Sequence, residues 1–594
     1  MIHLSNSFSY SRGRETLARS QVLRRSWPFV LDLAVAAIGL ACFYCIVLIA
    51  KFWAGPPNAQ IEVSLDPRRL PQYAFYSVTR IAFAYLLSLV FAVGYGYLAA
   101  YHKRAETFMI AVLDILQSIP VLSFLPGVML AMVGLFPTRH VGVELGAILL
   151  IFTGAVWNMA FSFYSSLKSI PRELIEATTV YHFSRWQRFM QLELPYAAIG
   201  LLWNSIMSVA GAWFFLMACE MFHFRSQDFR LPGLGSYLQT AADAGNGRAI
   251  AWGLATMIAI IVATDQLVWR PLIAWSDKFK FEQVESSKRV GSPILHLLTQ
   301  SHAIRALQEH TTVPFSEGLY ARLARRRERR VTALTNPVEP ARSTGMTRAI
   351  GWVVLTAAVL VILYMARQTV TLVRPVRGAE YVELLKGAAA TFGRVNLSLL
   401  LAAAWTIPAG VAIGFHPRLA RIAQPLAQIA ASVPATALFP VILLALVRLG
   451  GGLGIGSIAL MLLGTQWYIL FNVIAGALAI PTDLKEVATL FRFGTWQRWR
   501  TVILPGIFPF LITGMVTASG GAWNASIIAE YFRLNNQTLQ TTGLGAQISA
   551  ATEQGQFPIL LLGTVLISLM VVTTNRLVWR PLFRLAETRY RLGG

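Results

Sequence analysis

Twelve stretches of mostly apolar residues, each near the length needed to cross a membrane, run through this chain of 594 residues. A helix needs about 20 such residues to cross the hydrocarbon core of a bilayer. Only 13% of the residues are charged, whereas soluble domains carry about 25%. The sequence therefore predicts an all-α polytopic membrane protein with twelve transmembrane helices, and argues against a soluble enzyme. The predicted spans are 29–50, 74–101, 108–135, 141–165, 196–221, 249–273, 349–366, 394–415, 422–448, 453–480, 506–530 and 558–578.

The formal net charge of +23 indicates basic loops on one side of a membrane. The tail 1–26, the segment 277–348 and the C-terminal tail from Arg580 each carry an excess of Arg and Lys. Twelve spans place all three on one side, which the positive-inside rule makes the cytoplasm. We therefore predict a multi-pass protein of the bacterial inner membrane with both termini cytoplasmic. The segment 277–348 is either a solvated tether between the halves or a contact for anionic lipid or for a partner protein. No nucleic-acid partner is expected.

The second half of the chain repeats the first. The segment LVWRPL occurs at 267–272 and again at 577–582, and GAW at 211–213 recurs at 521–523, both 310 residues later. Each half holds six spans, so the repeat is parallel, with its two-fold axis along the membrane normal and a transport pathway at its interface. The predicted division is a basic tail (1–28), the first span with its external loop (29–71), a first repeated domain (72–275), a cytoplasmic basic linker (276–348), the seventh span with its loop (349–385), a second repeated domain (386–585) and a tail (586–594).

Two predicted cytoplasmic loops, at 166–195 and 476–505, share one pattern. Each has a Pro before a helix-period segment and ends at a Leu-Pro pair, with 19 residues between Glu176 and Pro195 and between Glu486 and Pro505. The pattern resembles the EAA loop of the permeases of ATP-binding-cassette importers, in the duplicated, fused form of a type I permease. Both copies depart from it at the Gly position, which holds His182 and Arg492. The alternative is a short interfacial helix that connects two spans and has no other role.

The resemblance implies that each EAA-like loop docks on a separate cytoplasmic ATPase. The chain has no Gly-rich phosphate-binding loop of its own. We therefore expect a transport subunit that is not an enzyme and holds no cofactor or metal. ATP and Mg²⁺ would bind to two copies of the partner ATPase, and a separate periplasmic or lipid-anchored binding protein would deliver substrate. The predicted coupling residues are Glu176, Ala177, His182, Arg185, Arg188, Pro195, Glu486, Ala488, Arg492, Gly494, Arg498 and Pro505.

The spans most resemble the nitrate, sulfonate, taurine and bicarbonate branch of this superfamily, which implies a small anion as cargo. The signals are an Arg early in the second span of each half, GAW in the fifth, and an acidic residue at the end of the fifth followed by GLG. Intramembrane polar residues are candidates for function. The alternatives are ion pairs, snorkelling and ordinary packing. The pathway candidates are Arg80, Gln117, Ser118, Trp213, Glu220, Arg394, Ser432, Thr436, Trp523, Asn524 and Glu530.

Three other functions remain open on the sequence. An ion-gradient secondary transporter would take up solute without ATP. A sensory or structural membrane protein would transport nothing. A permease of the same kind could also carry a non-anionic solute. The first two leave the paired EAA-like loops unexplained.

Overall fold

The computed structural model describes residues 63–276, 278 and 371–589, with gaps at 138–139, 225–226, 229, 449–451 and 535–536, and a few single residues between 356 and 370. The first predicted span and most of the seventh lie outside the described residues, as does most of the linker. The chain forms two compact units. The smaller unit comprises Met1–Gly55, Ser166–Leu202 and Thr264–Thr356; the larger comprises Pro56–Ser165, Trp203–Ala263 and Ala357–Gly594.

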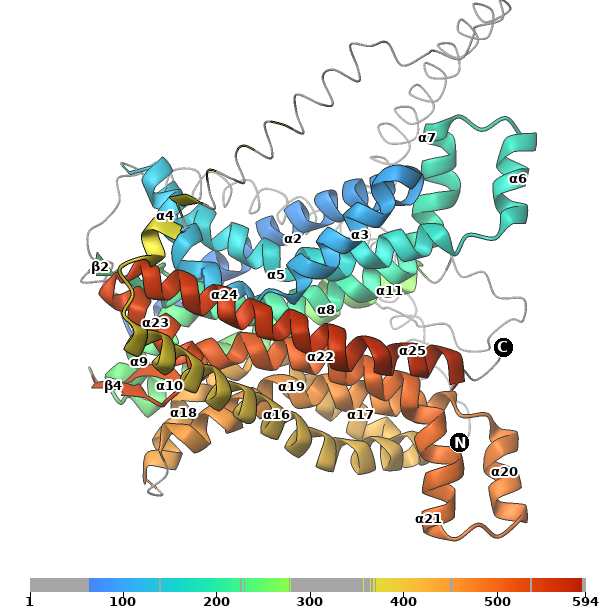
Figure 1. Cartoon of the computed structure of the whole chain (residues 1–594). Coiled ribbons are helices and arrows are strands. Elements are labelled where there is room, and N and C mark those ends of the chain that lie inside the picture. The colour runs from blue at the N-terminus through green and yellow to red at the C-terminus, as the bar shows by residue number, and fades with distance from the viewer. Residues whose placement is uncertain are drawn as a thin grey trace, which may run out of the picture. The chain divides into compact units, whose positions relative to one another are not determined.

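Eight helices of the described residues are long and apolar enough to cross a membrane. They coincide with eight of the twelve predicted spans, and the prediction is confirmed for these (Figure 1). The helices are α2 (Leu70–Tyr101, preceded by the 3₁₀ turn η1, Pro67–Arg69), α5 (Val141–Lys168), α8 (Leu194–Glu220), α10 (Gly247–Thr264), α16 (Gly378–Phe415), α19 (Leu453–Ala479), α22 (Leu504–Ala529) and α24 (Phe557–Thr574).

The third and ninth predicted spans are each broken in two by a proline. A proline disfavours helical dihedrals at the preceding residue and lacks an N–H for the helix. The residues before Pro120 and Pro434, Ile119 and Val433, are accordingly extended, and each ends a helix. Each proline therefore coincides with a break in the backbone helix. The pieces are α3 (Lys103–Ser118), η2 (Val121–Phe124) and α4 (Leu125–Leu135) in the first repeat, and α17 (Pro417–Ser432) and α18 (Ala435–Arg448) in the second.

Small residues let the long helices of the larger unit approach closely. A Cβ at Gly410 would lie 2.8 Å from the Val473 side chain, and one at Gly414 would lie 2.6 Å from Ala477 Cβ. These glycines lie four residues apart on one face of α16, which packs along α19. Membrane helices associate through such small-residue contacts because lipid supplies no hydrophobic force between them.

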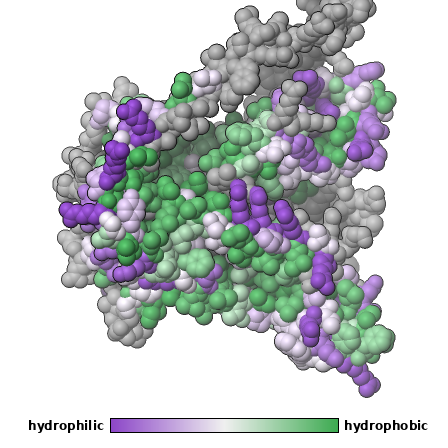
Figure 2. All heavy atoms as spheres, in the orientation of Figure 1, coloured by the Kyte–Doolittle hydropathy of each residue, from purple (hydrophilic) through white to green (hydrophobic). Residues whose placement is uncertain are grey.

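Large apolar side chains also remain exposed along the helices of the larger unit. Val90 on α2, Leu400 on α16 and Leu569 on α24 are examples, each more than half exposed. Figure 2 shows apolar surface over much of the visible face, with hydrophilic residues gathered toward the helix ends. Apolar patches of this extent mark a surface that is covered by another apolar phase, and for spanning helices that phase is the lipid.

Four π-helical turns precede prolines inside or at the ends of helices. At each one the residue before the proline donates its backbone N–H to the carbonyl five residues earlier, as Leu194 does to Phe189. A proline clashes with the carbonyl four residues before it, and the wider turn relieves that clash. The turns are η3 (Phe189–Glu193), η4 (Asp265–Trp269), η7 (Trp499–Ile503) and η8 (Asn575–Trp579), before Pro195, Pro271, Pro505 and Pro581.

A short antiparallel hairpin and a short helix follow α8 and α22. The strand pairs join His223 to Asp228 in the first repeat and Tyr531 to Gln540 in the second. We did not predict these hairpins from the sequence. The strands are β1 (His223–Phe224), β2 (Gln227–Asp228), β3 (Tyr531–Leu534) and β4 (Gln537–Gln540). The remaining helices are α6 (Arg172–Val180), α7 (Arg185–Arg188), α9 (Leu234–Asp243), α11 (Arg270–Ser276), α20 (Thr482–Leu490), α21 (Thr495–Arg498), α23 (Leu544–Gln554) and α25 (Arg580–Arg589).

Candidate functional site

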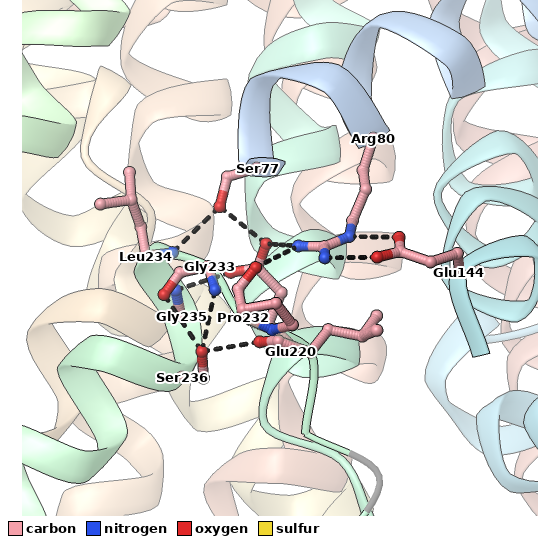
Figure 3. Close-up of polar contacts among 10 residues, drawn as sticks. Ser77, Arg80, Glu144, Glu220, Pro232, Gly233, Leu234, Gly235 and Ser236 are labelled. Atoms are coloured by element: carbon pink, nitrogen blue, oxygen red, sulfur yellow. Dashed lines mark hydrogen bonds and ion pairs between the residues drawn. The ribbon is translucent and has the colours of Figure 1, made fainter. Parts of the chain in front are cut away.

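A buried ion-pair cluster joins three long helices of the first repeat. The Arg80 guanidinium on α2 donates from Nε and Nη2 to the two oxygens of Glu144 on α5, at 2.6 and 2.7 Å. Its Nη1 donates to Glu220 Oε1 at the end of α8, at 2.7 Å, and to the Pro232 carbonyl at 3.0 Å (Figure 3). The Arg80 side chain is 1% exposed. Such bidentate, charge-assisted bonds are among the strong hydrogen bonds of proteins.

The loop that leads into α9 closes over the Glu220 carboxylate. Ser77 donates its hydroxyl to Glu220 Oε1 at 2.7 Å and accepts the Leu234 N–H at 3.0 Å. The Gly235 N–H donates to Glu220 Oε2 at 2.7 Å. A Cβ at Gly233 would collide with this carboxylate. The GLG segment is therefore glycine-rich because the backbone itself must approach and solvate a buried charge.

The second repeat builds the same cluster with one carboxylate fewer. Arg394 Nη1 donates to Glu530 Oε1 at 2.8 Å. Thr391 replaces Ser77: its hydroxyl bonds Glu530 and accepts the Leu544 N–H at 2.8 Å. The Gly545 N–H donates to Glu530 Oε2 at 2.9 Å. The structure thus forms the ion pairs that the sequence left open as one alternative for both arginines.

The two clusters differ at the position of Glu144, which the sequence analysis missed. Glu144 and Gly454 lie 310 residues apart, the same offset as Trp157 and Trp467 on the same two helices. Arg394 instead donates Nη2 to the hydroxyl of Thr541 at 3.0 Å. Its side chain is 16% exposed. A lone acid in an apolar stretch was the signal that could have identified Glu144.

None of the other pathway candidates whose side chains the structure describes forms a hydrogen bond or ion pair with these clusters. The two GAW tryptophans, Trp213 and Trp523, are 4% and 1% exposed and pack inside the larger unit. Gln117 lies 3.4 Å from Asn158. The Asn524 amide donates to the Gly520 carbonyl at 3.1 Å on its own helix. Thr436 is buried near the start of α18, whereas the side chains of Ser118 and Ser432 lie outside what the structure describes.

Each EAA-like loop forms a short helix that ends in a left-handed turn. In the smaller unit, α6 ends with the Phe183 N–H donating to the Thr178 carbonyl at 2.9 Å and the His182 N–H donating to Thr179 at 3.0 Å. His182 has φ of 52°. This is the hydrogen-bond pattern of a Schellman motif, whose left-handed position is usually Gly.

The loop of the larger unit repeats this turn. The Phe493 N–H donates to the Ala488 carbonyl at 3.0 Å, and Arg492 has φ of 50°. His182 and Arg492 are the non-glycine residues with positive φ among the described residues. The departure from Gly at this position therefore leaves the turn in place and adds backbone strain, because a Cβ disfavours the left-handed region.

The segments after the two turns differ in their caps. At the start of α7 the Gln187 N–H donates to the Ser184 hydroxyl oxygen, and the Ser184 N–H donates to the side-chain oxygen of Gln187. Gly494, at the start of α21, has no side chain that could accept a bond, and its N–H donates to the side-chain oxygen of Gln497. Arg188 pairs with Glu193 at 2.7 Å, whereas Arg498 donates to Thr489 at 3.3 Å.

The surface of both loops presents charged and apolar side chains. Glu176, Arg185 and Glu486 are exposed, Ala177 is half-buried and Ala488 is buried. Tyr181 at the end of α6 is 75% exposed, and Leu490 at the end of α20 is 81% exposed. Pro195 and Pro505 follow the π-helical turns that lead into α8 and α22.

Comparison with known proteins identifies the family. The sequence-family model described as "binding-protein-dependent transport system inner membrane component" matches residues 92–268 and again residues 406–578. The chain belongs to this family. Its two matches cover more than half of the chain, one in each repeat, so the protein is a duplicated all-helical membrane permease.

Curated relatives fall in one group of permeases. The bicarbonate transport system permease protein CmpB of Synechocystis is 30% identical over 24% of this chain and 49% of the relative. The nitrate import permease protein NrtB of Leptolyngbya laminosa is 27% identical over 32% of this chain and 64% of the relative. The taurine transport system permease protein TauC of Escherichia coli is 26% identical over 31% of this chain and 62% of the relative. The chain thus spans about half to two thirds of the length of these relatives.

Proposed function

We propose that this chain is the fused permease of an ATP-driven importer that moves a small anion across the inner membrane by alternating access. The observation that carries the proposal is the pair of EAA-like loops. Both have the same helix, the same left-handed turn and the same π-helical turn before a membrane helix. One such loop is consistent with a simple tie between spans, but two with one geometry indicate a shared mechanical task.

The exposed tips of the loops supply a docking surface for a cytoplasmic ATPase. Tyr181 in one loop and Phe491 in the other occupy the same position and are mostly exposed. Exposed aromatic side chains ringed by polar residues are typical of protein interfaces. Because the two permease halves are fused, one chain would engage two ATPase copies, each loop acting as a rigid lever on the helix that follows it.

The anionic cargo is supported by the names of the relatives, which transport bicarbonate, nitrate and taurine, and by an arginine in each repeat. Cytoplasmic termini follow from the basic tails and the positive-inside rule. A separate substrate-binding protein would deliver the anion.

Co-purification with a co-expressed cytoplasmic ATPase subunit tests the docking role. We expect the double variant Tyr181→Ala/Phe491→Ala to lose most ATPase from the purified complex. Tyr381→Ala on α16, an exposed aromatic outside both loops, is the matched control and should retain it. Unchanged ATPase binding and uptake in the double variant would overturn the docking assignment. Uptake that survives ATP depletion but collapses with the proton gradient would instead favour the secondary transporter.

A further inference from the structure

The two arginine clusters use their guanidinium groups to different extents. A guanidinium carries five N–H donors and no acceptor. Arg80 directs its Nε and Nη2 edge at both oxygens of Glu144. Arg394 Nη2 makes one bond among the described residues, to the Thr541 hydroxyl. The Nε of Arg394 has no partner in the part of the chain that the structure describes.

The missing carboxylate leaves a position beside Arg394 with no side chain. Among the described residues, a Cβ built on Gly454 would have one neighbour within 4 Å, Thr541 Oγ1 at 3.8 Å. Thr541 Oγ1 is itself bonded to Arg394 Nη2. Gly454 therefore lies next to Thr541, the partner of Arg394, at the position that Glu144 occupies in the first repeat. A Cβ at Gly454 would make ordinary van der Waals contact with Thr541 and would not overlap it.

The charges of the two clusters differ by one. In the first repeat one arginine faces two carboxylates, Glu144 and Glu220. In the second, Arg394 faces one, Glu530. The first repeat shows that the scaffold accommodates a second anion on the open edge of the arginine. A monoanion at Arg394 would give both clusters the same charge.

We propose that Arg394, Thr541 and the space beside Gly454 form a binding site for a small oxyanion that presents two oxygens in one plane. The bound ion would accept from Arg394 Nε and from one N–H of Nη2. The Thr541 hydroxyl, which accepts the other Nη2 N–H, would donate its own hydrogen to the ion. Nitrate, bicarbonate and carboxylates have this geometry. The site itself stands on these contacts; that its ligand is the transported cargo rests on the proposed function.

Ion binding to the purified full-length permease, without ATPase, tests the site. Thermal unfolding would be followed in sodium nitrate and in sodium formate, with sodium chloride at equal ionic strength as reference. We expect nitrate and formate to raise the apparent Tm of the wild type above its value in chloride. Gly454→Glu supplies the missing carboxylate, and should lower the apparent nitrate affinity at least tenfold without loss of folding.

Two further variants make the result specific. Gly452→Glu places the same charge two residues away, where a Cβ meets no described residue within 4 Å, and should keep the response to nitrate. Glu144→Gly opens the matching edge of Arg80, so its lowered Tm should be partly restored by formate but not by chloride. Equal nitrate responses in the wild type and Gly454→Glu, or no response beyond chloride in the wild type, would overturn the site. Because no ATPase is present, failure here leaves the coupling proposal untouched.

Discussion

Removing the Arg80 guanidinium should open the first repeat around its buried carboxylates. Arg80→Met deletes four hydrogen bonds, two to Glu144, one to Glu220 and one to the Pro232 carbonyl. Two buried acids then face each other without a cation. Breaking a buried pair by removing one partner costs about 3–5 kcal/mol, and tenfold in an equilibrium corresponds to about 1.4 kcal/mol. Local opening should therefore become about 10²- to 4 × 10³-fold more frequent.

A buried thiol next to the cluster reports that opening. Cys219 precedes Glu220 and is 0% exposed. With Cys42 and Cys45 replaced by Ala, it is the remaining thiol of the chain. The rate at which a maleimide modifies Cys219 in the folded protein then measures the population of open states when reclosing is faster than labelling.

Arg394→Met is the matched control for this measurement. It breaks the equivalent pair in the other repeat, where Glu530 keeps the Thr391 hydroxyl and the Gly545 N–H. We expect it to change Cys219 labelling by less than about tenfold, because the contacts that it removes lie in the other repeat, with Glu530 and Thr541. Equal labelling rates in Arg80→Met and Arg394→Met, or a rise below tenfold in Arg80→Met, would refute the reasoning that Arg80 holds this region closed.

Two other predictions follow from the backbone geometry. His182→Gly and Arg492→Gly should each stabilise their turn by about 0.5–1 kcal/mol, because Gly relieves the strain of a positive φ; hydrogen exchange at the Phe183 and Phe493 amides should slow two- to fivefold, and faster exchange would contradict the assigned strain. Gly233→Ala should displace the Glu220 carboxylate and accelerate Cys219 labelling by tenfold or more, since burying a poorly paired charge costs about 1–3 kcal/mol. Gly211→Ala, where a Cβ has no neighbour within 4 Å in the part of the chain that the structure describes, is its control and should leave labelling unchanged.

The architecture was largely predictable because it depends on patterns that repeat locally. A run of about 20 apolar residues specifies a span wherever it occurs. Pro120 and Pro434 marked the helix breaks through a steric rule that involves only neighbouring residues. The 310-residue offset between the repeats is enough to pair Glu220 with Glu530. Each of these inferences needs no knowledge of which helices meet.

The chemistry of the site was less predictable because it depends on contacts distant in sequence. Glu144 reaches Arg80 across 64 residues, and no counterpart in the second repeat drew attention to it. A comparison of the two repeats identifies residues that occur in both, whereas Glu144 has a glycine, Gly454, as its counterpart. The left-handed His182 and Arg492 were hidden for another reason: residue preference argues against this conformation, and only the hydrogen bonds of the whole turn impose it.

The two repeats are alike in the backbone of their EAA-like loops and differ in the charge of their arginine clusters, which indicates that the loops and the clusters have different tasks. The EAA-like loops agree in backbone conformation even where His182 and Arg492 must bear a strained φ. Strain is retained only when the surrounding structure demands one conformation, so the shape of the loop is what both copies share. The arginine clusters agree in framework but differ in charge. A second carboxylate on α5 completes one cluster internally, and glycine at the same position leaves the other incomplete. This difference in charge, with Glu144 in the first cluster and Gly454 in the second, is the feature on which the proposed anion site depends.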